Sequence, residues 1–440
     1  MKSIKNFTSA ASINVPIKNN KLVQSLISLS LRNRWLVLLF SIGLFLWGAY
    51  AVKQNPIDAI PDLSENQVIV FTEWMGRSPQ VIEDQITYPL ASNLQGIPNI
   101  RNIRATSMFG MSFIYVVFED NVDIYWARTR VLERLNYAQR LLPEGISPAL
   151  GPDGTGVGHV FWYTLEAPGY DLGELRSLQD WYIKYGLQTV KGVSEVASFG
   201  GFQKQYQITI DPNKLNYYNI SLMDVLKTVK ANNNDVGGRK FEMSGIGYIV
   251  RGMGYIKNLK DVENIPVGRD GTTPILIKDI ATVQMGGDLR LGIFDENGEG
   301  EAVGGIVVMR YGANADKVIT DVKKKMAEVE KGLPEGVKFK IAYDRSELIE
   351  AAISSVKKTI IEEILMVSLI VILFLFHLRS AFIIIIQIPV SIAASFILLQ
   401  AFGISSNIMS ITGIALAIGV VVDDGIVMVE NAYRHLSENN

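Results

Sequence analysis

The chain of 440 residues has no cysteine, only three histidines and a nearly balanced charge. Without cysteine it forms no disulfide, thiolate nucleophile or thiolate metal site. His159, His377 and His435 lie too far apart in the sequence to suggest an imidazole cluster. The formal net charge of -2 gives no reason to expect a polyanionic binding partner, so nucleic-acid binding is not expected. Soft-metal chemistry would have to use the 13 methionines.

Catalytic motifs are also missing from the sequence. No nucleophile stands beside a base in a recognisable arrangement. The glycine-rich run at 151–156 lacks the Lys-Ser/Thr ending of a phosphate-binding loop, and we interpret it as a linker. The sequence therefore predicts neither an enzyme nor a bound cofactor.

Hydrophobic residues make up 48% of the chain and are concentrated in four stretches. Residues 35–52 carry no charge and follow a leader, 1–34, that has basic but no acidic residues. This pattern predicts an uncleaved membrane helix that binds membrane lipid; the alternative is a signal peptide cleaved after Ala51. Three further spans are predicted, at 360–376, 381–399 and 408–429.

Charges beside these spans predict the topology. Arg379 stands between the second and third spans, Arg434 follows the fourth, and the loop between the third and fourth is uncharged. The positive-inside rule then places both termini, including residues 430–440, in the cytoplasm. Residues 53–359 lie on the other side, which is the periplasm in a bacterium with two membranes.

The large segment between the first two spans contains a repeated βαββα pattern. The first copy has predicted strands and helices at 67–72, 79–94, 100–107, 112–119 and 122–141. The second copy has them at 160–166, 172–190, 193–198, 203–210 and 222–231. In each copy we expect the last two strands to form a hairpin, the second around Gly200 and Gly201. The pattern predicts an α+β fold with two ferredoxin-like subdomains, each with helices on one face of an antiparallel sheet.

The second subdomain is expected to be interrupted. Residues 211–290 are rich in glycine and predict an inserted small α/β module. The strands at 305–310 and 337–342 and the charged helix at 316–331 are then expected to return to the second ferredoxin-like unit.

The fourth predicted span contains adjacent acids, Asp423 and Asp424, with Glu430 at its end. A charged carboxylate near the bilayer centre costs at least ~2.5 to 3.5 kcal/mol, so such residues are typical of proton relays. The alternative is a structural pair held by hydrogen bonds inside a helix bundle. Met409 and Met428 lie on the same span, and their thioethers suit Cu(I), although methionine in a membrane helix also serves ordinary packing.

Four separated motifs carry a resemblance to a known family. Residues 55–64 read NPIDAIPDLS, residues 125–133 YWARTRVLE, residues 175–181 LRSLQDW and residues 422–431 VDDGIVMVEN. In this order and at these places relative to the spans, they resemble the heavy-metal efflux branch of the resistance-nodulation-division (RND) superfamily, most of all its copper/silver CusA type. The resemblance extends over nearly the whole chain from residue 35.

The resemblance implies proton-driven efflux of a heavy-metal cation, Cu(I) or Ag(I), by a homotrimeric pump of the bacterial inner membrane. It also implies a periplasmic membrane-fusion adaptor and an outer-membrane channel as partners. In the family's terms, residues 53–150 are the first porter subdomain, 151–210 with 291–345 the second, and 211–290 a docking subdomain.

The resemblance also assigns roles to single residues. Asp423 matches the family's proton-carrying aspartate and Glu430 the acid below it on the same helical face. Asp424 stands where copper/silver pumps usually have alanine and multidrug pumps have a second aspartate. Met409 and Met428 match methionines proposed to relay Cu(I) or Ag(I), whereas Leu289 and Val421 replace two others. Ala417, in place of an aspartate, argues against the zinc, cobalt and cadmium group.

The length of the chain is about half that of such pumps, which have two homologous halves. We therefore expect an N-terminal half. Two alternatives are kept: a multidrug or other small-molecule RND exporter, which Asp424 favours, and a membrane-anchored periplasmic docking or assembly fragment that transports nothing.

Overall fold

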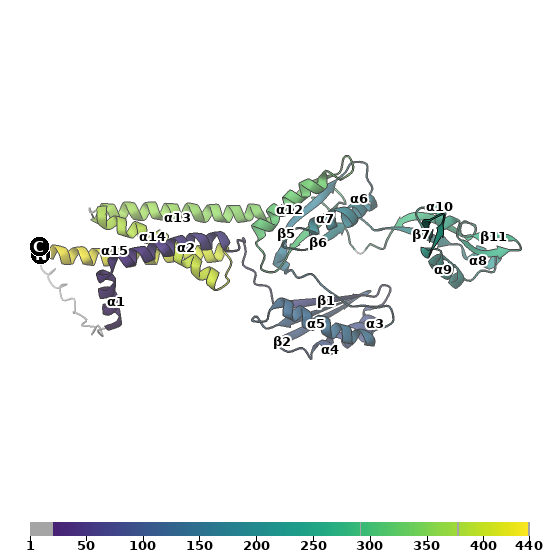
Figure 1. The fold of residues 1–440 in the computed structure, drawn as a ribbon, viewed down its shortest axis with the longest axis horizontal. Coiled ribbons are helices and arrows are strands. Elements are labelled where there is room, and N and C mark those ends of the chain that lie inside the picture. The colour runs from purple at the N-terminus through teal and green to yellow at the C-terminus, as the bar shows by residue number, and fades with distance from the viewer. Residues whose placement is uncertain (1–20, 291, 376–377, 439–440) are drawn as a thin grey trace, which may run out of the picture. The chain divides into compact units, whose positions relative to one another are not determined.

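The computed structural model describes residues 21–290, 292–375 and 378–438 (Figure 1). Part of the predicted basic leader, the end of the second predicted span and His377 lie outside these residues. The chain divides into two compact units. One combines Met1–Pro61 with Glu347–Asn440, and the other is Asp62–Ser346. Each unit is described separately.

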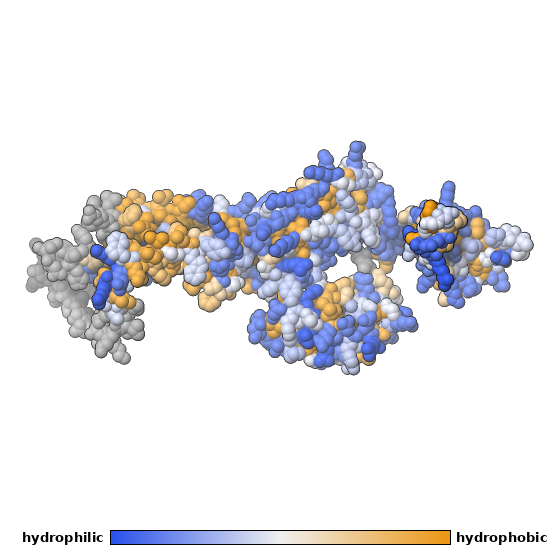
Figure 2. All heavy atoms as spheres, viewed as in Figure 1, coloured by the Kyte–Doolittle hydropathy of each residue, from blue (hydrophilic) through white to orange (hydrophobic). Residues whose placement is uncertain are grey.

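In the part of the chain that the structure describes, the first unit is built from the short helix α1 and four long apolar helices, and the long helices give the dense orange surface in Figure 2. The helices of this unit are α1 (Lys21–Arg32), α2 (Arg34–Gln54), α13 (Arg345–Leu375), α14 (Leu378–Ala401) and α15 (Ile408–Glu438). Within the described residues, two segments are long and apolar enough to cross a membrane, Arg34–Gln54 and Ile408–Ala432, and Ile385–Ala401 is a shorter apolar stretch. The predicted spans at 35–52 and 408–429 fall on these two segments. Those at 360–376 and 381–399 fall on α13 and α14 and remain predictions.

The second unit begins with a four-stranded antiparallel sheet in the order β2-β3-β1-β4. Its strands are β1 (Gln67–Glu73), β2 (Ile100–Met108), β3 (Met111–Phe118) and β4 (Ala149–Leu150). Its helices are α3 (Pro79–Ile82), the π-helical η1 (Glu83–Thr87), α4 (Tyr88–Leu94), α5 (Ile124–Ala138) and the 3₁₀ turn η2 (Gln139–Leu141). Val70, Ile114 and Val116 of the strands and Leu90 and Val131 of the helices join one buried core. The predicted hairpin of β2 and β3 is confirmed.

A second antiparallel sheet has the order β14-β5-β13-β6. Its strands are β5 (His159–Glu166), β6 (Val193–Gly200), β13 (Val303–Met309) and β14 (Lys338–Asp344). Its helices are η3 (Gly156–Gly158), α6 (Leu172–Leu178), the π-helical η4 (Gln179–Ile183), α7 (Lys184–Gln188) and α12 (Ala315–Glu330). In sequence order both sheets follow the pattern 4-1-3-2 of a ferredoxin-like βαββαβ unit. The expected return of the chain through β13, α12 and β14 is confirmed.

The predicted hairpin around Gly200 and Gly201 is wrong. β6 pairs with β13, whereas β7 (Lys204–Ile210) pairs with β12 (Ala281–Gly287) in a separate two-stranded sheet. Both glycines have positive φ, 72° and 61°, so the chain turns out of the sheet there and does not reverse alongside β6. The two strands joined by a tight turn in the first sheet are therefore joined by a long insertion in the second.

The insertion has its own small core around Val225, Val262, Ile277 and Ile280. Besides β7 and β12 it contains α8 (Pro212–Tyr217), α9 (Leu222–Ala231), β8 (Val236–Met243), β9 (Ile246–Gly252), α10 (Leu259–Glu263), β10 (Pro266–Asp270), β11 (Thr273–Leu276) and α11 (Ile277–Ile280). β8 pairs with β9 and β10 with β11. The expected small α/β module therefore has a hydrophobic core of its own.

Candidate functional site: an acidic face on helix α15

Helix α15 is held in the first unit by one apolar stripe. Ile414, Ile418 and Val422 recur every four residues, are buried and pack with Ile388 of α14. Because α-helical side chains at this spacing lie one above another, the stripe fixes the rotation of α15. The other faces of the helix are left exposed in the described part of the chain.

The predicted acids lie outside this stripe. Asp423, Asp424 and Glu430 are all exposed, although they belong to an apolar helix. Asp423 and Glu430 are about two turns apart and share a face, whereas Asp424 is rotated from Asp423 by about 100°. Among the described residues, no Lys or Arg side chain forms an ion pair with Asp423 or Asp424. The helix therefore carries exposed carboxylates outside the apolar stripe through which it packs in this unit.

The two predicted methionines lie on different parts of the helix. Met409 is about four turns before Asp423 and is 67% exposed, and Met428 is one turn after Asp424 and is 66% exposed. Helical geometry places Met409 near the Asp423 and Glu430 face and Met428 near Asp424. The structure does not bring the two methionines together, so they do not form a shared metal site within this chain.

A polar residue that the sequence did not predict, Gln387 of α14, contacts α15 next to the acids. Its side-chain amide donates to the carbonyl of Val421 at 3.4 Å. A side chain on Gly425 would place its Cβ 2.7 Å from the Gln387 Oε1, so glycine allows the two helices to approach here. The sequence signal that could have identified Gln387 is that it is a single glutamine within an apolar run. A polar side chain in a bilayer is costly unless it has a partner.

The first sequence motif fixes the beginning of α15. Asn55 is 2% exposed, and its amide donates to the Ser406 hydroxyl at 2.9 Å and to the Ile404 carbonyl at 3.1 Å. Backbone bonds from Ser406 to Pro56 and from Asp58 to Ser406 continue this contact. In the same unit, α2 and α14 approach closely at Gly48, where a Cβ would overlap Ala393. The motif thus positions the helix that carries the acids.

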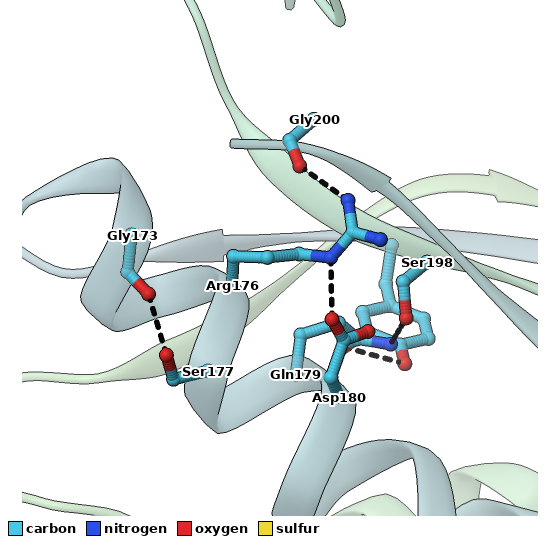
Figure 3. Close-up of polar contacts among 8 residues, drawn as sticks. Gly173, Arg176, Ser177, Gln179, Asp180, Ser198 and Gly200 are labelled. Carbon is cyan, nitrogen blue, oxygen red and sulfur yellow. Dashed lines mark hydrogen bonds and ion pairs between the residues drawn. The ribbon is translucent and has the colours of Figure 1, made fainter. Parts of the chain in front are cut away.

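The third motif, residues 175–181, contacts the point after Gly200 where the insertion leaves the second sheet (Figure 3). Arg176 donates to Asp180 at 2.7 Å and to the carbonyl of Gly200 at 2.8 Å. Gln179 is fully buried, accepts from the Tyr163 hydroxyl at 3.0 Å and donates to the Ser198 hydroxyl at 3.3 Å. Burial raises the pKa of Tyr163 well above its usual value, outweighing the hydrogen bond to Gln179. These residues have a structural role at the point where the chain leaves the sheet.

The second motif supplies a contact to the linker at 151–156. Tyr125 of α5 donates to Asp153 at 3.0 Å, and Arg128 donates to the Gly151 carbonyl at 2.9 Å. Asp153 also accepts from Ser194 and forms an ion pair with Arg310 at 3.2 Å. Partial burial opposes ionisation of Asp153, but the hydrogen bonds and the Arg310 charge together hold its pKa below its usual value. The expected linker therefore makes polar contacts with residues of both ferredoxin-like subdomains.

The chain combines apolar helices that carry exposed acids with two ferredoxin-like sheets. These features are typical of a class of membrane transporters. The chain belongs to the AcrB/AcrD/AcrF family, whose model matches residues 26–440. This match confirms the resemblance to RND proteins, which are transporters and not enzymes.

The relatives include cation efflux proteins. The chain is 44% identical to the cation efflux system proteins SilA of Salmonella typhimurium and CusA of Escherichia coli K12, over 95% of this chain and 40% of each relative. It is also similar to a crystal structure of a heavy metal efflux pump, with a TM-score of 0.83 and 36% identity over 93% of this chain and 41% of that one. The chain thus spans about two fifths of the length of the relatives it matches.

Proposed function

We propose that this chain takes part in proton-driven efflux of a heavy-metal cation, Cu(I) or Ag(I), across the bacterial cell envelope. The observation that carries the proposal is the pair Asp423 and Asp424 on exposed faces of an apolar helix. Carboxylates in a bilayer are costly unless they meet a polar partner, exchange protons or face water. A proton relay that alternates between such partners accounts for their placement.

The proposed relay consists of Asp423, Asp424 and Glu430. Asp423 and Glu430 share one helical face and would pass protons along it, with Asp423 binding the proton that drives transport. Asp424 lies on a neighbouring face, next to the glycine at which Gln387 approaches α15. Met409 and Met428 are proposed metal ligands that would need partners from outside the described helices.

The proposed setting is a homotrimer in the inner membrane with a periplasmic adaptor and an outer-membrane channel. We propose four spans, at 35–52, 360–376, 381–399 and 408–429, with both ends of the described chain on the cytoplasmic side. Residues 53–150 and 151–210 with 291–345 would be porter subdomains, and residues 211–290 the docking subdomain. The printed names of the relatives, cation efflux system proteins and a heavy metal efflux pump, support the transport of a metal cation.

The test compares Asp423→Asn with Asp424→Asn, each introduced into the gene in its native cell. Growth is measured in copper, silver and zinc, and trimer assembly is measured after mild detergent extraction. We expect Asp423→Asn to abolish copper and silver resistance with assembly intact, because asparagine keeps the side-chain size but carries no titrating proton. Asp424→Asn is expected to reduce resistance less.

Unchanged resistance in Asp423→Asn would contradict the proton-relay proposal. Protection by the unaltered protein against zinc but not against copper or silver would contradict the proposed metal. If the unaltered protein exports organic compounds but no metal, the multidrug alternative holds; if it assembles with partners but exports nothing, the docking alternative holds.

A further inference from the structure

Three methionines gather at one end of the first sheet, far along the sequence from the methionines of α15. Met108 ends β2, and Met111 begins β3 directly opposite it across the hairpin turn. Met75 follows β1 by two residues. Gly110 is the second residue of that turn. If it carried a Cβ atom, that atom would lie 3.0 Å from the Sδ of Met75. The three side chains therefore surround one two-residue turn.

The register of the strands places these methionines on the same face. Ser107 and Ser112 both contact the buried Thr87 of η1, so they point to the helix-covered face of the sheet. Side chains alternate between faces along a strand, which puts Met108 and Met111 on the opposite, open face. Directly opposed residues have their Cβ atoms about 4.5 to 5.5 Å apart, within reach for two flexible thioethers on one ion.

Met75 reaches the same hairpin turn from the segment that follows β1. Glu73 pairs with Met111, and the next residue, Trp74, packs against the buried core. The backbone N–H of Trp74 donates to the Gly110 carbonyl at 2.8 Å, and that of Gly110 donates to the Arg77 carbonyl at 2.9 Å, so this segment is fastened to the hairpin turn. The position of its Sδ near Gly110 then brings a third thioether to the same hairpin turn.

Packing does not explain this cluster. Met75 and Met108 are each 51% exposed, and neither joins the core of the first sheet. Methionine commonly fills gaps in cores, but here Met75 and Met108 are exposed and Met111 is partly exposed. Glu73 is exposed beside Met111 and adds negative charge that attracts cations, whereas the nearby Arg77 is stacked on the Trp74 ring at 4.6 Å.

We propose that Met75, Met108 and Met111 form a binding site for a soft monovalent metal ion, Cu(I) or Ag(I). Thioethers select soft ions and bind Zn²⁺ poorly, and three of them can surround an ion that accepts low coordination numbers. The identity of the physiological ligand rests on the proposed function, since a protein that exports such ions would encounter them in the cell envelope. Binding itself requires no transport.

The test uses the purified full chain in detergent, with methionine methyl groups labelled with ¹³C and Ag(I) added as the probe. At one equivalent we expect the methyl resonances of Met75, Met108 and Met111 to shift together. Met253 serves as the control, because it is 70% exposed but lies in the insertion. Zn²⁺ is expected to shift none of the three.

Variants then separate a site from general thioether binding. Met111→Leu keeps the size of the side chain and removes one ligand, so we expect the affinity for Ag(I) to fall at least about tenfold, the loss typical when only a hydrogen-bond partner of a metal ligand is removed. Met253→Leu is expected to leave it unchanged. Amide hydrogen exchange in β2 and β3 checks that the hairpin is intact in Met111→Leu.

Parallel shifts of all exposed methionines, or equal affinities of Met111→Leu and Met253→Leu, would overturn the site. That result would leave the Asp423 experiment unaffected. Conversely, a relay that failed in cells would not alter silver binding by the purified chain, so the two proposals fail independently.

Discussion

The two ferredoxin-like sheets have the same strand order but differ at one connection. In the first, two residues join β2 to β3, and three methionines surround the turn. In the second, the corresponding strands β6 and β13 are separated by the insertion between Gly200 and Val303. Both connections use a glycine with φ of 72°, Gly110 and Gly200. The comparison shows that one fold accepts either a tight turn or a complete module at this point.

The largest expected effect is that of Gly200→Ala compared with Gly110→Ala. A left-handed conformation costs alanine about 1 to 2 kcal/mol, and this applies to both positions. At Gly200 the new Cβ would also overlap the carbonyl oxygen of Ala302, whereas at Gly110 the nearest atoms, the sulfur and Cα of Met75, would lie 3.0 and 3.2 Å away. We expect Gly200→Ala to lower the free energy of unfolding by about 3 kcal/mol or more and Gly110→Ala by about 1 to 2.

Chemical denaturation of the full chain in detergent, followed by hydrogen exchange in each sheet, measures both effects. Equal losses at the two glycines would show that the backbone conformation alone matters and that the insertion root is not tightly packed.

The sequence predicted much of this architecture because local patterns encode it. Alternating apolar residues predicted β1 and β3, and the expected hairpin of β2 and β3 is present, but the fourth strand, β4, was not predicted. In the second sheet, Gly200 and Gly201 suggested a similar turn, and β7 was assigned to the wrong sheet. The partner of β6 is β13, which lies about a hundred residues later, and no local pattern encodes such a pairing.

The candidate sites show the same limit. Asp423 and Glu430 could be placed on one face from helical spacing alone. Gln387 was missed because its approach to Gly425 depends on the packing of α14 against α15. Met75 was likewise missed, since only the pairing of β1 with β3 brings it to the turn that holds Met108 and Met111.

A second, smaller effect compares the polar side chain that each sheet buries beneath its π-helical turn. Thr87 of η1 forms hydrogen bonds of 2.8 Å with Ser107 and Ser112, and Gln179 of η4 bonds Tyr163 and Ser198. We expect Gln179→Leu to cost about 1 to 3 kcal/mol, because it leaves the buried Tyr163 hydroxyl without its acceptor.

Thr87→Val is expected to cost less, about 1 kcal/mol, because its two serine partners are hydroxyls that can rotate to other acceptors. Denaturant midpoints of the two variants measure the difference. A larger loss for Thr87→Val would mean that the first sheet depends more on its buried polar contact than the second.

The smallest expected effect is a pH dependence at Asp153, which contacts both sheets through Tyr125 on one side and Ser194 and Arg310 on the other. Burial opposes its ionisation, but the hydrogen bonds and Arg310 prevail, and its pKa in the folded chain lies below the usual value of 3.8. The unfolded chain therefore binds the proton more readily. The stability that Asp153 contributes is complete above pH 3.8 and is lost as the pH falls through the folded-state pKa.

Asp153→Asn removes this titration while keeping an acceptor oxygen for Tyr125. Because the carboxylate is only partly shielded from solvent, we expect a loss of about 1 kcal/mol at neutral pH that disappears as the pH falls through the folded-state pKa of Asp153. Hydrogen exchange of the linker at 151–156, measured between pH 3 and pH 6 after correction for intrinsic exchange rates, follows the change. A difference between the variant and the unaltered chain that stays constant over this range would mean that Asp153 stabilises the connection through its shape and hydrogen bonds and not through its charge, and that the connection between the sheets does not loosen in acid.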